Sequence, residues 1–270
     1  MRSFASLLIL IVTGCGAAQG SPSADSSPSA VAPAAGMSIQ ALGSVEGAPM
    51  GYLEYLPPGY GDGESRPLLV FLHGSGEAGD GSEAELGLVD KLGPPQLIEA
   101  GDWPDDRPFV VLAPQYGTGP ANNDCAIGED VAGFLEFAIT HYEVDPARVY
   151  LSGISCGAIG SWDYIAAHGD EVVVAAAVLI SGHPEWALEE AGCAPLTEVP
   201  VWAFHGALDN IVPMVHVLEP IDQILACEGA DAVELELTVY PNADHDAWTR
   251  TYDLTAGHDI YAWMLEHTAD

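Results

Sequence analysis

The stretch V-Y-L-S-G-I-S-C-G, residues 149–157, decides the fold of this chain. An apolar run ends there in G-I-S-C-G, which follows the pattern G-x-S-x-G around Ser155. This pattern is typical of a strand that turns sharply into a helix and leaves the serine hydroxyl exposed at the corner. The turn is so tight that larger side chains two positions before and after the serine would collide with neighbouring backbone. We therefore expect a strand before Ser155 and a helix after it.

Apolar segments alternate with helical segments along the rest of the chain, which predicts an α/β fold: a mostly parallel sheet of about eight strands with helices on both faces. Several segments, such as residues 67–72, are apolar throughout, as expected for parallel strands covered on both sides. The expected strands are residues 38–45, 52–56, 68–72, 109–112, 149–151, 173–180, 201–204 and 233–239. Helices fill the gaps, notably residues 129–142, 156–168, 215–227 and 256–267. Ligands bind such sheets at the carboxyl ends of the strands, so the residues after each strand matter most.

A glycine-rich turn, H-G-S-G-E at residues 73–77, follows the strand at 68–72. Backbone N–H groups of such a turn can bind a developing oxyanion, and we pair the N–H of Ser75 with that of Cys156 for this role. We expect the His73 ring to support the loop rather than to take part in chemistry. Glu77 either pins the loop or faces water.

Two further strands are followed by residues that can activate a serine. Asp209 lies on the loop after residues 201–204, and His245 lies on the loop after the last strand. The chain order Ser155, Asp209, His245 is that of α/β-hydrolases and differs from the orders of chymotrypsin and subtilisin. We therefore expect a catalytic triad of these three residues.

Other acids and histidines are assigned structural roles. Asp244 and Asp246 adjoin His245 in sequence and would have difficulty reaching its ring nitrogen distal to Ser155, so we interpret them as loop or surface residues. A packing or solvated role is expected for the histidines without a nucleophile partner, which are His168, His183, His216 and His258.

Four segments, residues 67–79, 149–162, 199–213 and 240–252, resemble the feruloyl-esterase and poly(3-hydroxybutyrate)-depolymerase-like branch of the α/β-hydrolases, which includes exported proteins often labelled predicted peptidases. The resemblance runs over nearly all of residues 52–266. Its most specific parts are P-V-W-A-F-H-G at 200–206 and H-D-A-W at 245–248. It implies Ser155 as nucleophile, His245 as base and Asp209 as the acid that orients the base. Relatives usually have Met-Gly-Gly after the serine, where this chain has C-G-A.

These features favour a serine ester hydrolase that works through an acyl-enzyme. Residues 183–199 are too few for a large lid, so we expect an open site that suits bulky or polymeric esters, such as acylated polysaccharide or polyester. Residues 116–123 and three tryptophans, Trp162, Trp186 and Trp248, are candidate contacts, with core packing the favoured alternative for each tryptophan. A serine peptidase of the prolyl-oligopeptidase-like type is the enzymatic alternative, and a non-catalytic surface-binding lipoprotein is the other. No metal-ligand spacing, phosphate loop or dinucleotide fingerprint occurs, so we expect neither metal nor cofactor.

The first residues predict export. Arg2 precedes an apolar run at residues 4–12, too short to span a bilayer and followed by small residues and Cys15. The ending resembles a bacterial lipobox, which implies a signal peptide at 1–15 and lipidation of Cys15, with Gly16 in favour of the outer membrane. An ordinary secretory signal cleaved near residues 17–19 is the alternative. Residues 16–36, rich in Ser, Pro and Ala, read as a flexible tether, and residues 37–270 as one catalytic domain.

The charge balance is strongly acidic, with 40 Asp and Glu residues against 6 Lys and Arg and a net charge of −34. Such a surface repels nucleic acid and anionic lipid, so we expect no nucleic-acid partner and membrane contact only through the lipid anchor. The composition indicates either a saline habitat or simply an acidic secreted protein.

Four cysteines remain once Cys15 is set aside, and three pairings are open to them. Cys125 and Cys156 are expected near the carboxyl ends of strands, whereas Cys193 and Cys227 both precede strands. The disulfides Cys125–Cys156 and Cys193–Cys227 are therefore the easiest to form, and free buried cysteines are the alternative.

Overall fold

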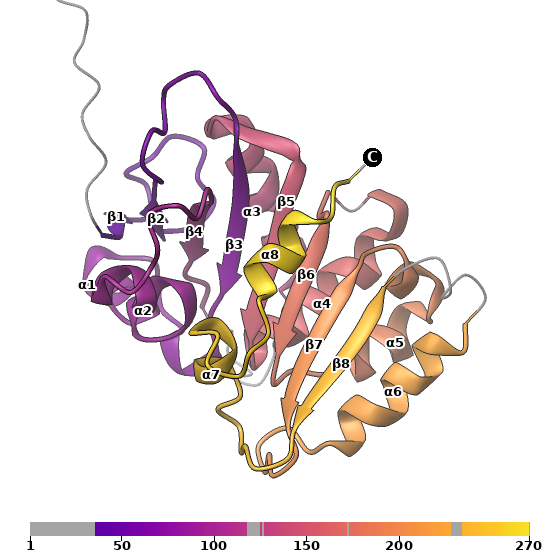
Figure 1. The fold of residues 1–270 in the computed structure, drawn as a ribbon. Helices are drawn as coiled ribbons and strands as arrows, with labels where there is room; N and C mark the ends of the chain where they lie inside the picture. Colours follow the sequence, from indigo (N-terminus) through magenta and orange to yellow (C-terminus); the bar gives the residue numbers. More distant parts are fainter. Residues whose placement is uncertain (1–35, 118–124, 126, 172, 228–233, 270) are drawn as a thin grey trace, which may run out of the picture. The chain divides into compact units, whose positions relative to one another are not determined.

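Eight strands form one sheet in the order β1-β2-β4-β3-β5-β6-β7-β8 (Figure 1). The structure, a computed structural model, describes residues 36–117, 125, 127–171, 173–227 and 234–269. β1 and β2 are antiparallel to their neighbours, and the six strands from β4 across to β8 run parallel. The strands are β1 (Ser38–Gln40), β2 (Tyr52–Tyr55), β3 (Arg66–Leu72), β4 (Val110–Pro114), β5 (Val144–Ile154), β6 (Ala176–Ile180), β7 (Val201–Gly206) and β8 (Leu235–Tyr240).

Helices cover both faces of the sheet (Figure 1). One face is covered by α3 (Gly128–His141), α4 (Cys156–His168), α5 (Glu185–Ala191) and α6 (Val215–Leu225). The other face is covered by α1 (Glu83–Leu86), α2 (Gly93–Ala100), α7 (Trp248–Tyr252) and α8 (Ile260–Leu265). Short 3₁₀ turns lie at η1 (Ser75–Glu77), η2 (Val89–Lys91), η3 (Gly169–Glu171) and η4 (Ala194–Thr197).

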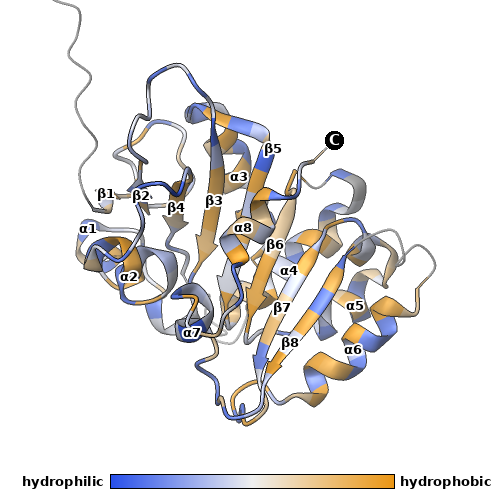
Figure 2. Ribbon diagram, in the orientation of Figure 1, coloured by the Kyte–Doolittle hydropathy of each residue, from blue (hydrophilic) through white to orange (hydrophobic). Residues whose placement is uncertain are grey.

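Strand β3 shows why the apolar segments form a two-sided core. Side chains alternate between the faces of a strand, so Leu68 and Val70 pack against α3 and α4, whereas Leu69 and Phe71 pack against the opposite layer. All four are at most 1% exposed. Burial of each contributes roughly 1.5–3 kcal/mol. Figure 2 shows the consequence, an apolar sheet between helices whose outer faces are polar.

The eight predicted strands and the α/β fold are confirmed, with corrections at several element ends. The strand predicted at 149–151 runs from Val144 to Ile154. The first strand ends at Gln40 rather than residue 45, because the chain turns there with Gly43 at φ 81°. The strand predicted at 173–180 begins at Ala176. The last helix begins at Ile260 rather than residue 256, because the Asp259 carboxylate caps it by accepting from the Ala262 N–H at 3.0 Å.

The predictions for the first 35 residues, including the signal peptide, Cys15 and most of the tether, lie outside the described residues. All described residues belong to one of the two units into which contacts divide the chain, Ala32–Asp270. In that described part, no helix combines the length and apolar character needed to cross a membrane.

Two disulfides occur on the side of the sheet that α4 covers. Cys125 pairs with Cys156 at a Cα–Cα distance of 5.1 Å, and Cys193 pairs with Cys227 at 6.3 Å. These are the two pairings expected from the strand order. Cys156 is the first residue of α4, so the first disulfide lies beside Ser155.

Candidate active site

Ser155 occupies the corner between β5 and α4. Its φ of 49° and ψ of −116° are unusual for a residue with a side chain, and such strain is typical of functional turns. A Cβ on Gly153 would lie 2.5 Å from the carbonyl carbon of Gly157, so the strand and helix can approach only because glycines stand there. The Ser155 N–H donates to the Ile180 carbonyl at 2.8 Å, which fixes the corner against β6.

The three predicted triad residues meet at the carboxyl ends of the strands. Ser155 Oγ lies 2.9 Å from His245 Nε2, and His245 Nδ1 lies 2.7 Å from Asp209 Oδ2. Since a carboxylate only accepts, Nδ1–H donates to Asp209, and Nε2 of the neutral ring is left to accept from the serine hydroxyl. The arrangement can therefore take the proton of Ser155 as the oxygen attacks a carbonyl carbon.

Three N–H groups donate to the Asp209 carboxylate, whose side chain is fully buried. Oδ1 accepts from the backbone N–H of Ile211 at 2.8 Å and of Val212 at 2.9 Å. Oδ2 accepts from His245 and lies 3.2 Å from His205 Nε2. Hydrogen bonds to the ionised form compensate for the loss of water around a buried charge.

Two positioning residues near the triad were not identified from the sequence. His205, at the end of β7, donates from Nε2 to the Val212 carbonyl at 2.9 Å, and this nitrogen lies 3.2 Å from Asp209 Oδ2. Burial lowers the pKa of His205, which keeps the ring neutral. Ser181, at φ 55°, donates from Oγ to the His245 carbonyl at 2.8 Å. Their roles depend on contacts between separate loops, which residue spacing does not reveal.

The loop with Ser75 is supported from beneath by His73, as expected. His73 is fully buried, its Nδ1 donates to the Gly74 carbonyl at 2.7 Å, and its Nε2 accepts from the Tyr116 N–H at 3.2 Å. The Tyr116 ring stacks on the imidazole, with centroids 3.9 Å apart, and its hydroxyl donates to the His73 carbonyl. Burial lowers the pKa of His73 to about 4.

Glu77, in the same loop, is partly buried. Burial raises the pKa of its carboxyl, and backbone hydrogen bonds at Gly74 and Glu77 oppose this shift.

The expected oxyanion donors, Ser75 and Cys156, line the same pocket as Ser155. Cys156 begins α4, and the first N–H groups of a helix have no partner within that helix and lie at the positive end of its dipole. Its N–H is therefore suited to bind a negatively charged oxygen beside Ser155.

A pocket of about 430 Å³ opens next to Ser155. One part of its wall is apolar and includes Ile159, Val212 and Pro213. The remaining residues that line it, besides those of the nucleophile and oxyanion positions, are Cys125, His183, Glu185, Trp186, Ile211 and His216. His183 is buried and His216 is partly exposed, which fits the packing or solvated role interpreted from the sequence, and both also lie in the pocket wall.

The aromatic contacts predicted from the sequence have different outcomes. Trp162 is 1% exposed and belongs to the core, which is the role that the sequence favoured for it. Trp186 is 45% exposed and lines the pocket. Trp248 packs edge-on against the His245 ring, with centroids 5.2 Å apart. Of the loop at 116–123, Tyr116 is buried, and residues 118–123 lie outside the described residues.

Asp244 and Asp246 are loop residues, as interpreted from the sequence. Asp246 accepts from the N–H and the hydroxyl of Thr249, both at 2.9 Å, at the start of α7. Asp244 accepts from the Asp246 N–H at 3.3 Å. Neither competes with Asp209 for His245.

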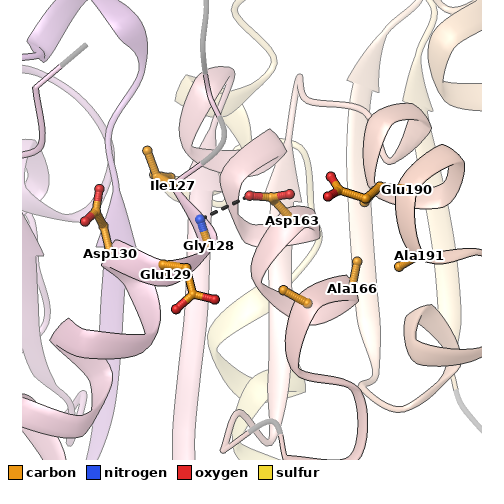
Figure 3. A pocket seen from close by; sticks show the side chains of 10 residues that line it. Ile127, Gly128, Glu129, Asp130, Asp163, Ala166, Glu190 and Ala191 are labelled. Atoms are coloured by element: carbon orange, nitrogen blue, oxygen red, sulfur yellow. Dashed lines mark hydrogen bonds between the residues drawn. The ribbon is translucent and has the colours of Figure 1, made fainter. Parts of the chain in front are cut away.

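A second hollow, of about 350 Å³, lies between α3, α4 and α5 (Figure 3). Glu129, Asp130, Asp163 and Glu190 line it together with four alanines, and Asp163 accepts from the Gly128 N–H at 3.1 Å. Among the described residues that line it there is no serine, cysteine or histidine, so these residues offer no group for nucleophilic catalysis. Over the described residues, no cluster of three or more His, Cys, Asp or Glu side chains could hold a metal ion.

A model of the dienelactone hydrolase family matches residues 120–263, more than half of the chain. The chain belongs to the dienelactone hydrolase family. The matched region contains Ser155, Asp209 and His245, and membership of this family confirms the α/β-hydrolase assignment. The feruloyl-esterase and depolymerase-like branch stays a prediction. No curated protein sequence matches the chain.

Solved esterases share the fold of this dienelactone hydrolase family member. Esterase 2 of Thermogutta terrifontis phosphonylated by cyclosarin has a TM-score of 0.57 at 17% identity, over 85% of this chain and 94% of that one. The butyrate-bound form of the esterase from this Planctomycetes species has a TM-score of 0.56 at 18% identity, over 86% of this chain and 94% of that one. A thermostable esterase has a TM-score of 0.54 at 21% identity, and the match covers 82% of this chain. This chain spans only 60% of the length of that esterase.

Proposed function

We propose that the protein is a serine carboxylic ester hydrolase in which Ser155 is the nucleophile, His245 the general base and acid, and Asp209 the residue that orients His245. The observation that carries the proposal is the continuous hydrogen-bonded chain from Ser155 Oγ through both ring nitrogens of His245 to Asp209. The fold that the chain shares with solved esterases supports it.

The proposed reaction has two half-reactions. Ser155 Oγ attacks the ester carbonyl carbon while His245 Nε2 takes its proton, and the N–H groups of Ser75 and Cys156 bind the oxyanion. His245 then protonates the leaving alcohol oxygen as the carbon–oxygen bond breaks, which leaves an acyl-enzyme on Ser155. Water attacks the acyl-enzyme by the same route and releases the acid.

Kinetics on a soluble ester test this proposal. We expect Ser155→Ala to lower kcat for 4-nitrophenyl butyrate by a factor on the order of 10⁴ to 10⁶, because the covalent route is lost. The exposed Ser44 provides a matched control, and Ser44→Ala should keep wild-type kcat. Turnover of the 4-nitroanilide with a kcat/KM above that of the ester would instead favour the peptidase alternative.

We extend the proposal to bulky or polymeric esters, because the pocket opens to solvent beside the half-exposed Trp186. Release of acid from feruloylated or acetylated polysaccharide, or from a polyester film, measures this activity. Turnover confined to small soluble esters would contradict the extension.

We further propose that the protein is exported and held at the bacterial cell envelope through a lipid on Cys15, on the basis of the lipobox-like end of the first 15 residues. Metabolic labelling with a fatty-acid analogue should mark the full chain and not Cys15→Ser. Equal labelling of both chains, or labelling of neither, would contradict lipidation at this position.

A further inference from the structure

The pocket beside Ser155 lies on the side expected to hold the acyl part of an ester. A leaving alcohol takes its proton from His245 Nε2 and must therefore lie against His245. Among the described residues that line the pocket are Ser75, Ser155 and Cys156, but His245 is not one of them. The pocket thus extends from the carbonyl position away from the leaving group. Its volume of about 430 Å³ suits a small organic group.

His183 supplies a polar group inside this pocket. It is 7% exposed, because its neighbour Gly182 packs so closely on α4 that a Cβ there would lie 2.5 Å from that of Ala158. His183 Nδ1 is fully buried and has no hydrogen-bond partner among the described residues. Since Nδ1 is inaccessible and His183 lines the pocket, we assign the contact with a bound group to Nε2. Burial lowers the pKa of His183 to about 4, with Glu185 opposing, so the ring is uncharged at neutral pH.

Glu185 supplies the negative charge of the pocket wall. Its Oε2 accepts from His216 Nδ1 at 2.8 Å, and the two side chains are 32% and 42% exposed. No lysine or arginine is among the described residues that line the pocket. An acyl chain ending in a carboxylate would therefore meet a like charge and find no cation.

Resting on the proposed ester hydrolysis, we propose that this pocket selects uncharged acyl chains that end in a hydroxyl or similar neutral hydrogen-bonding group, which His183 binds, and that Glu185 excludes acyl chains that end in a carboxylate. An apolar wall suits the carbon chain, and the His183 ring in the pocket wall offers a polar group to a ligand that carries a hydroxyl. His183 and Glu185 are then specificity residues with separable effects.

Three 4-nitrophenyl esters of equal chain length test the proposal on the full-length protein: hexanoate, 6-hydroxyhexanoate and the adipate monoester. For the wild type we expect kcat/KM for the hydroxyl ester to exceed that for hexanoate by about tenfold, as one hydrogen bond provides. We expect the adipate monoester to fall below hexanoate by about tenfold or more. Measurement in 0.5 M NaCl screens the field of the distant surface charges.

The variants separate the two residues. His183→Phe should bring the hydroxyl-to-hexanoate ratio near one and leave the adipate ratio unchanged, and His183→Gln, which can place an amide near Nε2, should restore part of the hydroxyl preference. Glu185→Gln should raise the adipate-to-hexanoate ratio about fivefold and leave the hydroxyl ratio unchanged. Glu190→Gln, on the same helix but lining the other hollow, is the matched control and should change neither ratio.

Binding of the same esters to Ser155→Ala, followed by calorimetry, separates this inference from the proposed function. If Ser155→Ala binds the hydroxyl ester most tightly and the adipate monoester least tightly, but the wild type hydrolyses none of the three, the proposed hydrolase activity is wrong and the proposed selectivity of the pocket is supported. Hydrolysis without a preference for the hydroxyl ester, a preference for the adipate monoester, or a hydroxyl preference that survives His183→Phe would overturn the selectivity and leave the hydrolase in place.

Discussion

Ser155, His245 and Asp209 are held by neighbours that are not themselves expected to react. Ser155 is fixed to β6 by its N–H, and His245 by the Ser181 hydroxyl at its carbonyl. Asp209 is held by the Val212 N–H, and His205 supports this loop through the Val212 carbonyl. Each contact joins a different loop to the site. A small displacement of a reacting group costs much of the rate, so these contacts are expected to affect kcat more than KM.

His205 provides the first test at this scale. His205→Phe removes the hydrogen bond to the Val212 carbonyl, on the loop whose N–H groups bind Asp209. A hydrogen bond between neutral groups contributes about 0.5–1.5 kcal/mol, so we expect kcat to fall up to about tenfold with KM little changed. His205→Gln can replace the donor and should recover much of kcat. If both variants lose activity equally, or if only KM changes, the positioning role is wrong.

Protonation of His73, which supports the oxyanion loop, makes the stability of the fold depend on pH. Its pKa is 6.5 when unfolded and about 4 in the fold, so between these values the unfolded chain binds the proton first. Stability is therefore complete above pH 6.5 and is lost as the pH falls toward 4, by about 3 kcal/mol in all. Urea unfolding at pH 7 and pH 4.5 should show a smaller pH dependence for His73→Asn than for the wild type. His141 is exposed, and His141→Asn is the control that should keep the wild-type pH dependence of the unfolding free energy. The same pH dependence in His73→Asn as in the wild type would contradict this account.

At the scale of elements, the two disulfides close chain segments of similar length, 31 and 34 residues. The entropy of loop closure therefore predicts about 3–4 kcal/mol for each. Only Cys125–Cys156 lines the pocket and anchors the residue after Ser155.

The pair permits a matched experiment. Both double variants, Cys125→Ala with Cys156→Ala and Cys193→Ala with Cys227→Ala, should lower the melting temperature by similar amounts. We expect only the first to lower kcat/KM, by about tenfold or more, when assayed well below both melting temperatures. A similar loss of kcat/KM in both would show that the Cys125–Cys156 disulfide has no special role at the site.

The sequence predicted the elements better than their contacts. Strands such as β3 are apolar throughout, and α4 begins and ends at the predicted residues, because the glycine pattern marks its start. The bounds of α2 were not predicted, since its first turn contains Pro94 and Pro95, which a helix tolerates only at its start. The polar pocket wall was missed because His183 and His216 come from separate elements that meet only in the folded chain.

Over the whole molecule, the net charge of −34 opposes folding through self-repulsion. Salt screens this repulsion, since the Debye length falls from about 10 Å at 0.1 M to about 3 Å at 1 M. We expect the melting temperature to rise by several degrees between 0.1 and 2 M NaCl, because a gain of about 1 kcal/mol shifts it by about 2–4 °C in a chain of this size. Thermal unfolding followed by circular dichroism measures it. A flat or falling melting temperature would contradict a saline adaptation.

The central claim, that Ser155 is an activated nucleophile, is tested most directly by labelling the purified protein with a fluorophosphonate probe in 0.1 M and in 2 M NaCl, followed by mass spectrometry of the peptides. The account predicts one adduct, on Ser155, in the wild type, and none in Ser155→Ala. No adduct on a folded wild type at either salt concentration, or an adduct that persists in Ser155→Ala, would contradict it.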